Sequence, residues 1–213
     1  MLSAACPGCG GEITFRSKTS VLCVCRFCRS NIVRHDIDLE VIGKQAELME
    51  DMSPLQIGVN GKYRNKSFQI LGRQILSWSD GLWNEWYIAF SDGTDGWLAE
   101  AQGEFSILLA PETRVKLPLP HEIDQLSSFP YKSSKFEIVD RKKIKCLGSE
   151  GELPFKTVEG SQSTVYDYSD NKNGFASIEV DATSEVHIYI GEFTSLGSLR
   201  VSGIRYFSGW GKP

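Results

Sequence analysis

Five of the six cysteines lie in the stretch CPGCGGEITFRSKTSVLCVCRFC, and this cluster constrains the fold more than any other feature. Cys6 and Cys9 form one C-x-x-C pair, and Cys25 and Cys28 form a second, with fifteen residues between the pairs. This spacing is typical of a zinc ribbon, in which four thiolates hold one tetrahedral ion at about 2.3 Å. Because four thiolates close the coordination shell, we predict one structural zinc ion with no open position for substrate.

The residues around the two pairs complete the predicted ribbon, which we assign to residues 1–35. Gly8 and Gly10 suit tight turns, since glycine adopts backbone angles that other residues avoid. The segments EITF and SVLCV are predicted to form the two strands of one hairpin. Cys23 would need a wider loop to replace Cys25, so we interpret Cys23 as a buried or spare thiol. The sixth cysteine, far along the chain, is interpreted as a small hydrophobic residue.

The composition excludes several classes of protein. The chain has 213 residues, of which 41% are hydrophobic and 23% charged, which suits one medium domain or two small ones. No stretch approaches the roughly 18 apolar residues that cross a bilayer. The N-terminus MLSAACPGCG lacks the basic and apolar regions of a signal peptide. We therefore predict a cytoplasmic protein with no membrane span, a composition that still allows peripheral membrane association. Cytoplasmic thiols stay reduced, which favours metal binding over disulfides.

The ribbon is more basic than the rest of the chain. Residues 1–36 carry five basic and two acidic side chains, a net charge of +3, whereas the remaining residues sum to −7. This asymmetry favours an anionic partner such as nucleic acid. The competing interpretation is a solvated basic face, because the segment has no dense run of lysine and arginine. The candidate anion-binding residues are Arg16, Lys18, Arg26 and Arg29.

A connector at residues 36–54 leads to a first predicted β unit at residues 55–110. Gly43 and Pro54 interrupt the loose helical spacing of the connector, so we predict at most a short helix or an extended path. The segments SFQILGRQIL, LWNEWYIAF, GWLAE and EFSILL then read as antiparallel strands separated by Asp-Gly turns. Short strands at this density predict a small, bent barrel.

Two segments of this unit carry a family resemblance. They are SPLQIGVNGKYRNKSFQILGR and GLWNEWYIAFSDGTDGWLAEAQGEFSIL, which contain a G-x-x-G turn, an F-x-I-x-G-R strand, a W-x-E-W-Y strand and a D-G-x-x-G-W-L hairpin. Over roughly residues 53–195 the chain resembles the bacterial family catalogued as domain of unknown function 4178, whose members often carry an N-terminal zinc ribbon. The resemblance implies an accessory role in envelope maintenance, since such proteins are found with membrane-stress and polyamine-related genes, and it implies no chemistry.

A second β unit is predicted at residues 132–213, after a proline-rich linker at residues 111–131. SKFEIVDRKK in the second unit is similar to KSFQILGRQ in the first, at an offset near 68 residues, which suggests two copies of one unit. We therefore predict a mainly β fold, in which the zinc ribbon precedes two small antiparallel units of barrel or sandwich type. Strand alternation places Ile178 and Ile188 on apolar faces, with His187 and Tyr189 opposite and outward.

The sequence contains no recognisable catalytic constellation. Its three histidines, His35, His121 and His187, lie outside the motifs that supply a nucleophile or a catalytic metal. Asp92 and Asp95 suit the turn in which they lie, because Asp hydrogen-bonds its own backbone there. We therefore expect a protein without enzymatic activity.

Aromatic residues in the first unit suggest a binding face. Alternation places Trp86, Ile88 and Phe90 on one face of their strand and Glu85 on the other, between two aromatic residues. An acid flanked by aromatics is how small barrels hold a cationic or peptide ligand, although a solvated cross-strand salt bridge is the simpler interpretation.

The candidate partner-binding residues are Trp83, Glu85, Tyr87 and Trp97. We expect an adaptor that binds a protein partner, with nucleic-acid binding through the ribbon as the alternative.

Overall fold

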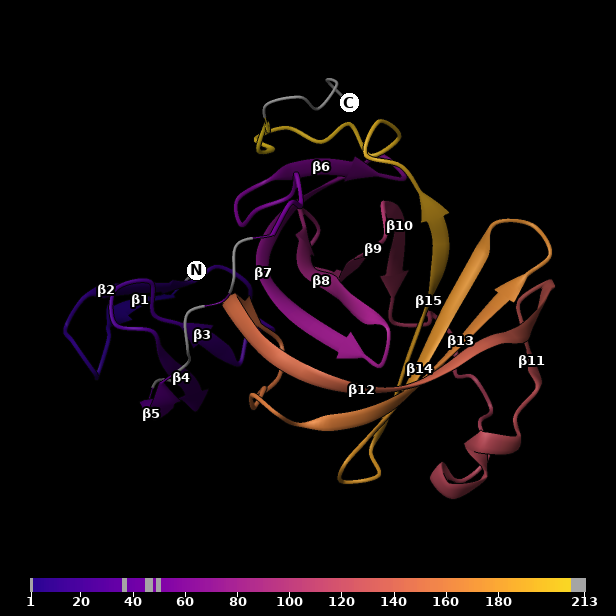
Figure 1. The fold of residues 1–213 in the computed structure, drawn as a ribbon. Helices are drawn as coiled ribbons and strands as arrows, with labels where there is room; N and C mark the ends of the chain where they lie inside the picture. The colour runs from indigo at the N-terminus through magenta and orange to yellow at the C-terminus, as the bar shows by residue number, and fades with distance from the viewer. Residues whose placement is uncertain (1, 36–37, 45–47, 49–50, 208–213) are drawn as a thin grey trace.

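The computed structural model describes residues 2–35, 38–44, 48 and 51–207, and strands dominate them (Figure 1). This confirms the predicted mainly β, antiparallel fold with an N-terminal four-cysteine module. The ribbon strands are β1 (Leu2–Ala5), β2 (Glu12–Phe15), β3 (Leu22–Val24), β4 (Ser30–His35) and β5 (Asp38–Lys44). The next strands are β6 (Asn60–Tyr63), β7 (Lys66–Trp78), β8 (Gly81–Phe90), β9 (Asp95–Ala101) and β10 (Glu104–Leu109). The last elements are a 3-10 helix η1 (Pro120–Gln125), β11 (Ser128–Tyr131), β12 (Ser134–Leu153), β13 (Gln162–Asp170), β14 (Gly174–Asp181) and β15 (Val186–Thr194).

Eight of these strands close into a ring, which we call the barrel. β7, β8, β9 and β10 pair in succession, as do β12, β13, β14 and β15. Antiparallel pairing of β10 with β15 and of β12 with β7 then joins the two sets. The two β units expected from the sequence thus contribute half of one barrel each. This arrangement pairs strand edges that two separate four-stranded sheets would leave open.

The two halves of the barrel follow the same plan. Each begins with a hairpin, β6–β7 or β11–β12, that is closed by a two-residue turn. Arg64 and Lys132 occupy the first turn position and have positive φ angles of 46° and 51°. Such turns match the right-handed twist of the flanking strands. The predicted linker at residues 111–131 contains η1 and β11, which covers one edge of β12.

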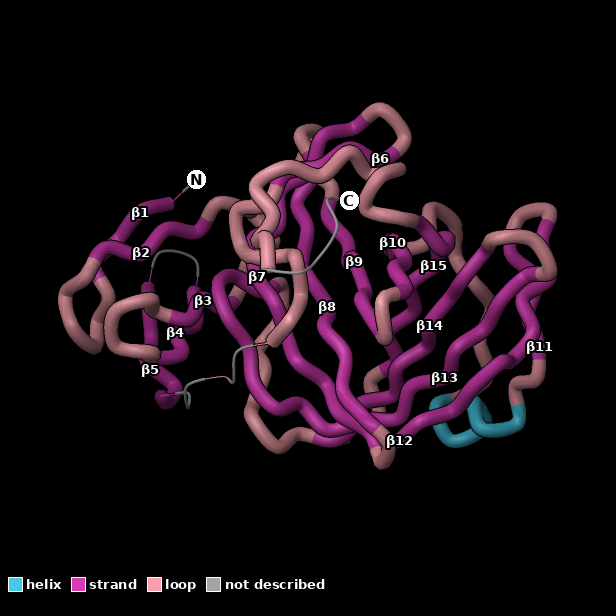
Figure 2. Tube along the Cα trace, turned by 45° about the horizontal axis from the view of Figure 1, so that its top comes forward, coloured by secondary structure: helices cyan, strands magenta, loops and turns pink. Residues whose placement is uncertain are grey.

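The apolar faces of the barrel strands point outward. In the first half, Trp86 and Ile88 pack against Leu55 and Leu199, which come from the segments that precede β6 and follow β15. In the second half, Ile178 and Ile190 pack with Ile123 of η1, the helix coloured cyan in Figure 2. The predicted alternation is therefore correct. However, the face opposite these residues lines the barrel interior, so the prediction that His187 points outward is wrong.

The ribbon adjoins the barrel at the C-terminal end of β12. Figure 1 shows β1 to β5 beside this strand, and β3 pairs with its last two residues, Glu152 and Leu153. Leu22 and Val33 of the ribbon join Tyr87, Trp97 and other barrel residues in one apolar cluster. The ribbon therefore covers one end of the barrel.

The predicted hairpin of EITF with SVLCV does not form. β2 pairs with β1 in a separate two-stranded sheet, whereas β3 pairs with β4 and β12. The hairpin does not form because β2 pairs instead with the first strand of the ribbon, and β3 pairs with β4 and the distant β12. The local sequence does not reveal these partners. In the connector, β5 is extended, one of the two predicted forms; residues 36–37, 45–47 and 49–50 lie outside the described residues.

Candidate functional site

The four predicted ligands, Cys6, Cys9, Cys25 and Cys28, converge on one point. Their sulfur atoms all lie within 4.8 Å of one another. The Sγ atoms of Cys6 and Cys28 are 3.7 Å apart, and those of Cys9 and Cys25 are 3.8 Å apart. A tetrahedral ion with metal–sulfur bonds of about 2.3 Å requires sulfur–sulfur separations of about 3.8 Å. The donor set therefore fits a metal ion, with no fifth protein ligand required.

The two knuckles that present these sulfurs have the same backbone hydrogen bonds. The amide of Gly10 donates to the carbonyl of Cys6 at 2.8 Å, and the amide of Arg29 donates to the carbonyl of Cys25 at 2.9 Å. Gly10 and Arg29 both have positive φ, 76° and 60°. The prediction for Gly10 is therefore confirmed, whereas the second knuckle places an arginine in the same strained conformation.

Gly8 is required for space rather than for an unusual backbone angle. A Cβ at this position would lie 2.9 Å from the hydroxyl of Ser30. That hydroxyl lies 3.2 Å from the sulfur of Cys28, and the amide of Gly8 donates to the sulfur of Cys6 at 3.3 Å. Contacts of this kind orient metal-binding thiolates.

The other two cysteines do not belong to this group of four sulfurs. Cys23 is 7% exposed and Cys146 is 5% exposed. Burial raises the pKa of the Cys23 thiol to about 12 and also raises that of Cys146. Both are therefore neutral thiols at physiological pH, in agreement with their predicted roles.

The predicted partner-binding residues lie inside the barrel. Tyr87 is fully buried and Trp97 is 3% exposed, so neither presents a face to a partner on the outside. Glu85 and Trp83 line the interior, where the carboxylate of Glu85 accepts hydrogen bonds from Gln74 Nε2 at 2.7 Å and Trp83 Nε1 at 3.2 Å. Among the described residues Glu85 forms no salt bridge, which disfavours the interpretation of Glu85 as part of a solvated cross-strand salt bridge.

Burial and the negative charge of Glu179 raise the pKa of the Glu85 carboxyl to about 7. Sequence analysis did not select Glu179, Asp167 or Tyr189, which line the same interior. Their alternate spacing along β13, β14 and β15 was the available signal. This spacing did not identify an interior site, because the polar face of those strands was expected to point outward.

The residues that form the barrel match the model of a protein family. A model of the domain of unknown function DUF4178 matches residues 56–196, two thirds of the chain. The chain belongs to the DUF4178 family. No curated protein and no solved structure matches it. The matched range runs from just before β6 to just after β15, so the DUF4178 domain is the complete barrel and excludes the ribbon.

One carboxylate fastens the ribbon to the DUF4178 barrel. Glu152 is 4% exposed, and one of its oxygens accepts bonds from the amides of Arg16 at 2.7 Å and Ser17 at 3.2 Å and from the hydroxyl of Ser20 at 2.8 Å. In the same ribbon loop, the hydroxyl of Thr19 lies 2.6 Å from that of Tyr87. Glu152 therefore satisfies three ribbon donors at the end of β12.

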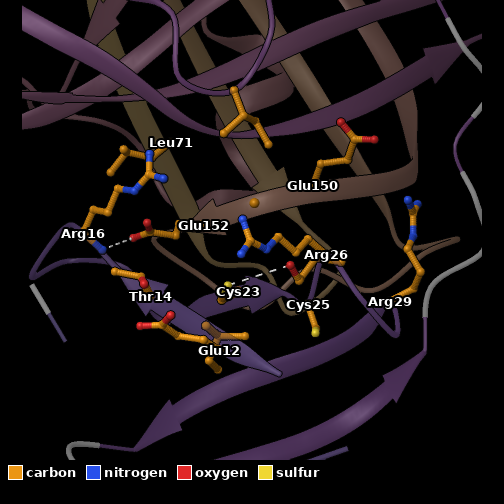
Figure 3. A pocket seen from close by; sticks show the side chains of 14 residues that line it. Glu12, Thr14, Arg16, Cys23, Cys25, Arg26, Arg29, Leu71, Glu150 and Glu152 are labelled. Carbon is orange, nitrogen blue, oxygen red and sulfur yellow. Dashed lines mark hydrogen bonds between the residues drawn. The ribbon is translucent and has the colours of Figure 1, made fainter. Parts of the chain in front are cut away.

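A cleft of about 400 Å³ lies between the ribbon and the DUF4178 barrel (Figure 3). It is lined by three of the four predicted anion-binding residues, Arg16, Arg26 and Arg29, whereas Lys18 is not part of its lining. Three glutamates line the same cleft, so its charges balance. They are Glu12, Glu150 and Glu152.

The tip of the second knuckle is exposed. Phe27 is 58% exposed, and the guanidinium of Arg26 lies 4.7 Å from the centre of its ring. This stacked pair is the one predicted basic site that also offers an exposed aromatic surface. No described helix is long and apolar enough to span a membrane.

Proposed function

We propose that the protein is a non-enzymatic, cytoplasmic zinc-ribbon adaptor. Two properties of the cysteine cluster support zinc. The four sulfurs have tetrahedral separations, and four thiolates are the ligand set of structural zinc sites. A reducing compartment suits this proposal, because cysteines that bind metal must not be oxidised to disulfides.

Metal analysis of protein purified without chelators tests the metal assignment. We expect one zinc ion per chain, lost in a Cys9→Ser and Cys28→Ser double variant. Cys23→Ser is the matched control, since Cys23 lies outside the cluster, and it should retain the metal. Absence of zinc from the wild type would contradict the assignment.

The observation that carries the adaptor proposal is the free edge of β5. β5 lies at one end of the long sheet and, among the described residues, pairs only with β4. Val41 and Ile42 on this strand are 37% and 39% exposed. At the other end of the sheet, the edge of β6 is covered, because the amide of Lys62 donates to the carbonyl of Leu199 at 2.7 Å and Asn60 pairs with Ser202. An uncovered edge of this kind is where a partner protein adds a strand.

The double variant Val41→Lys and Ile42→Lys tests the β5 surface, because lysine on an edge strand blocks added strands. We expect partners captured by the wild-type protein under cross-linking to be lost from this variant. Leu119→Lys, which changes another exposed apolar residue (59%), should retain them. Equal capture by both variants would remove β5 from the proposal.

Nucleic-acid binding is a second candidate because Arg26 and the exposed Phe27 form a stacked pair. Bases stack on such aromatic residues, and arginine contacts phosphate. The neighbouring glutamates of the cleft weaken this candidate. Micromolar binding to single-stranded RNA that falls steeply with salt, and that Phe27→Ala abolishes, would place it above the adaptor.

A further inference from the structure

The barrel interior is hollow. A cavity of about 390 Å³ occupies it, and a second cavity of about 270 Å³ shares part of its lining. The residues that line both are Glu85, Leu108, Val165 and Ser177. A volume in this range is sufficient for a small organic molecule.

The lining of the larger cavity is acidic. Glu85 and Glu179 lie within the barrel, Asp181 ends β14, and Glu185 lies in the turn that leads to β15. Among the described residues, Lys156 is the one lysine or arginine in this lining. Glu179 accepts a hydrogen bond from Ser163, and Glu85 accepts its bonds from neutral donors. Neither carboxylate has an ion-pair partner among the described residues.

Asp167 is a third interior acid, and unlike Glu85 and Glu179 it has an ion-pair partner. Asp167 lines the smaller cavity and lies 3.2 Å from the ammonium of Lys142. Lys142 also lies 2.6 Å from Asp140. Lys156 and His187 line the larger cavity, but among the described residues neither forms an ion pair with Glu85 or Glu179, so these two carboxylates face the cavity without a directly bonded cation.

Apolar surface accompanies these acids. Trp97, Leu108 and Tyr189 line the same cavity, and Phe155 packs against Trp97 with ring centres 5.6 Å apart and the rings tilted by 38°. Aromatic faces attract cations, and this attraction strengthens where water is excluded. An anionic ligand would meet unpaired carboxylates, and a neutral ligand would leave them uncompensated.

We propose that the barrel interior binds an organic cation, whose ammonium group lies between Glu85 and Glu179 and whose aliphatic body contacts Trp97 and Leu108. The ligand supplies the positive charge that this part of the barrel lacks. The site shares no residue with the adaptor surface on β5, so failure of either proposal would leave the other unaffected. Asp181 and Glu185 at the mouth attract the same sign of charge.

Calorimetric titration with 1-pentylamine, and with 1-pentanol as a neutral compound of the same length, tests the proposal. At pH 8, above the pKa of about 7 for Glu85, we expect the amine to bind at least tenfold more tightly than the alcohol. Equal binding of the two compounds, or binding of neither, would overturn the proposal.

Two substitutions identify the site. Glu85→Gln and Glu179→Gln each remove a charge with little change in shape, and each should weaken amine binding at least tenfold. Glu137→Gln is the control, since Glu137 is an exposed residue of β12 that lies outside both cavity linings. Thermal unfolding establishes that each variant is folded, and the Glu179 variant decides the question if the Glu85 variant is not. Unchanged affinity in a folded Glu85 or Glu179 variant would overturn the proposal.

Discussion

Among single residues, Glu85 carries a charge that the fold disfavours. Its carboxyl has a pKa of about 7, against an ordinary value of 4.5, because burial and the charge of Glu179 oppose ionisation. The folded protein therefore holds a proton on Glu85 that the unfolded chain releases between pH 4.5 and 7. Over this range rising pH lowers the stability contributed by Glu85, and above pH 7 the full penalty remains.

This linkage gives a prediction for Glu85→Gln. Each unit of pKa shift corresponds to about 1.4 kcal/mol, so the variant should gain up to about 3 kcal/mol relative to the wild type as pH rises from 4.5 to 8. Denaturant unfolding of both proteins at several pH values measures the gain. A constant difference between them would contradict the raised pKa. The other carboxyl, lysine and histidine side chains that line the two cavities are Glu104, Asp140, Lys142, Lys156, Asp167, Glu179, Asp181, Glu185 and His187; the thiol of Cys146 and the phenol of Tyr189 line the larger one.

The sequence could predict the convergence of the four cysteines but not the surroundings of Glu85. The spacing of Cys6 and Cys9 restricts geometry locally, whatever the rest of the chain does. Glu85 differs because alternation along β8 separates two faces without saying which one lies inside. Leu55 and Leu199, which cover the opposite face, come from the segments just before and just after the matched domain. Because these two segments fold back over the outside of the strands, the apolar face is buried outside the barrel and the polar face lines its interior.

Among the strands, β12 decides how the barrel closes. Its 20 residues pair first with β13 and β11, then with β7, and finally with β3. Hydrophobic patterning predicted strands in both halves, since each strand carries its own alternation. It could not reveal that one strand changes partner along its length, because each change depends on segments distant in sequence. The same limitation explains the mistaken hairpin between β2 and β3.

Gly72 is the tightest point of the seam between β7 and β12. A Cβ there would lie 1.8 Å from the carbonyl oxygen of Glu152, a backbone atom that cannot turn aside. Gly72→Ala should therefore cost about 2 kcal/mol or more, through forced displacement of one strand. Gly197→Ala, whose Cβ would lie 4.0 Å from its nearest neighbour, should change stability by less than about 0.5 kcal/mol. Chemical denaturation compares them, and equal midpoints would show that the seam tolerates a methyl group.

At the scale of the whole molecule, the ribbon and the barrel bury apolar residues in one shared interface. The ribbon core is small and includes three of the four clustered cysteines, so under the proposed zinc assignment its folding depends on the metal. Leu22 and Val33 of the ribbon pack with Tyr87 and Trp97 at the covered end of the barrel. Loss of the ribbon would therefore expose apolar surface of the barrel itself.

Metal removal should consequently destabilise the barrel as well as the ribbon. Burial of a large apolar side chain contributes about 1.5–3 kcal/mol, so uncovering this cluster should cost the barrel about 2–4 kcal/mol. Chelation should also shift tryptophan emission to the red, because Trp97 becomes hydrated. Glu152→Ala should shift barrel unfolding in the same direction without releasing metal, since it leaves three ribbon donors unsatisfied. Glu150→Ala, in the same cleft, is the matched control and should behave as the wild type. A barrel unfolding midpoint unchanged by chelation would mean that the ribbon is attached to the barrel without stabilising it.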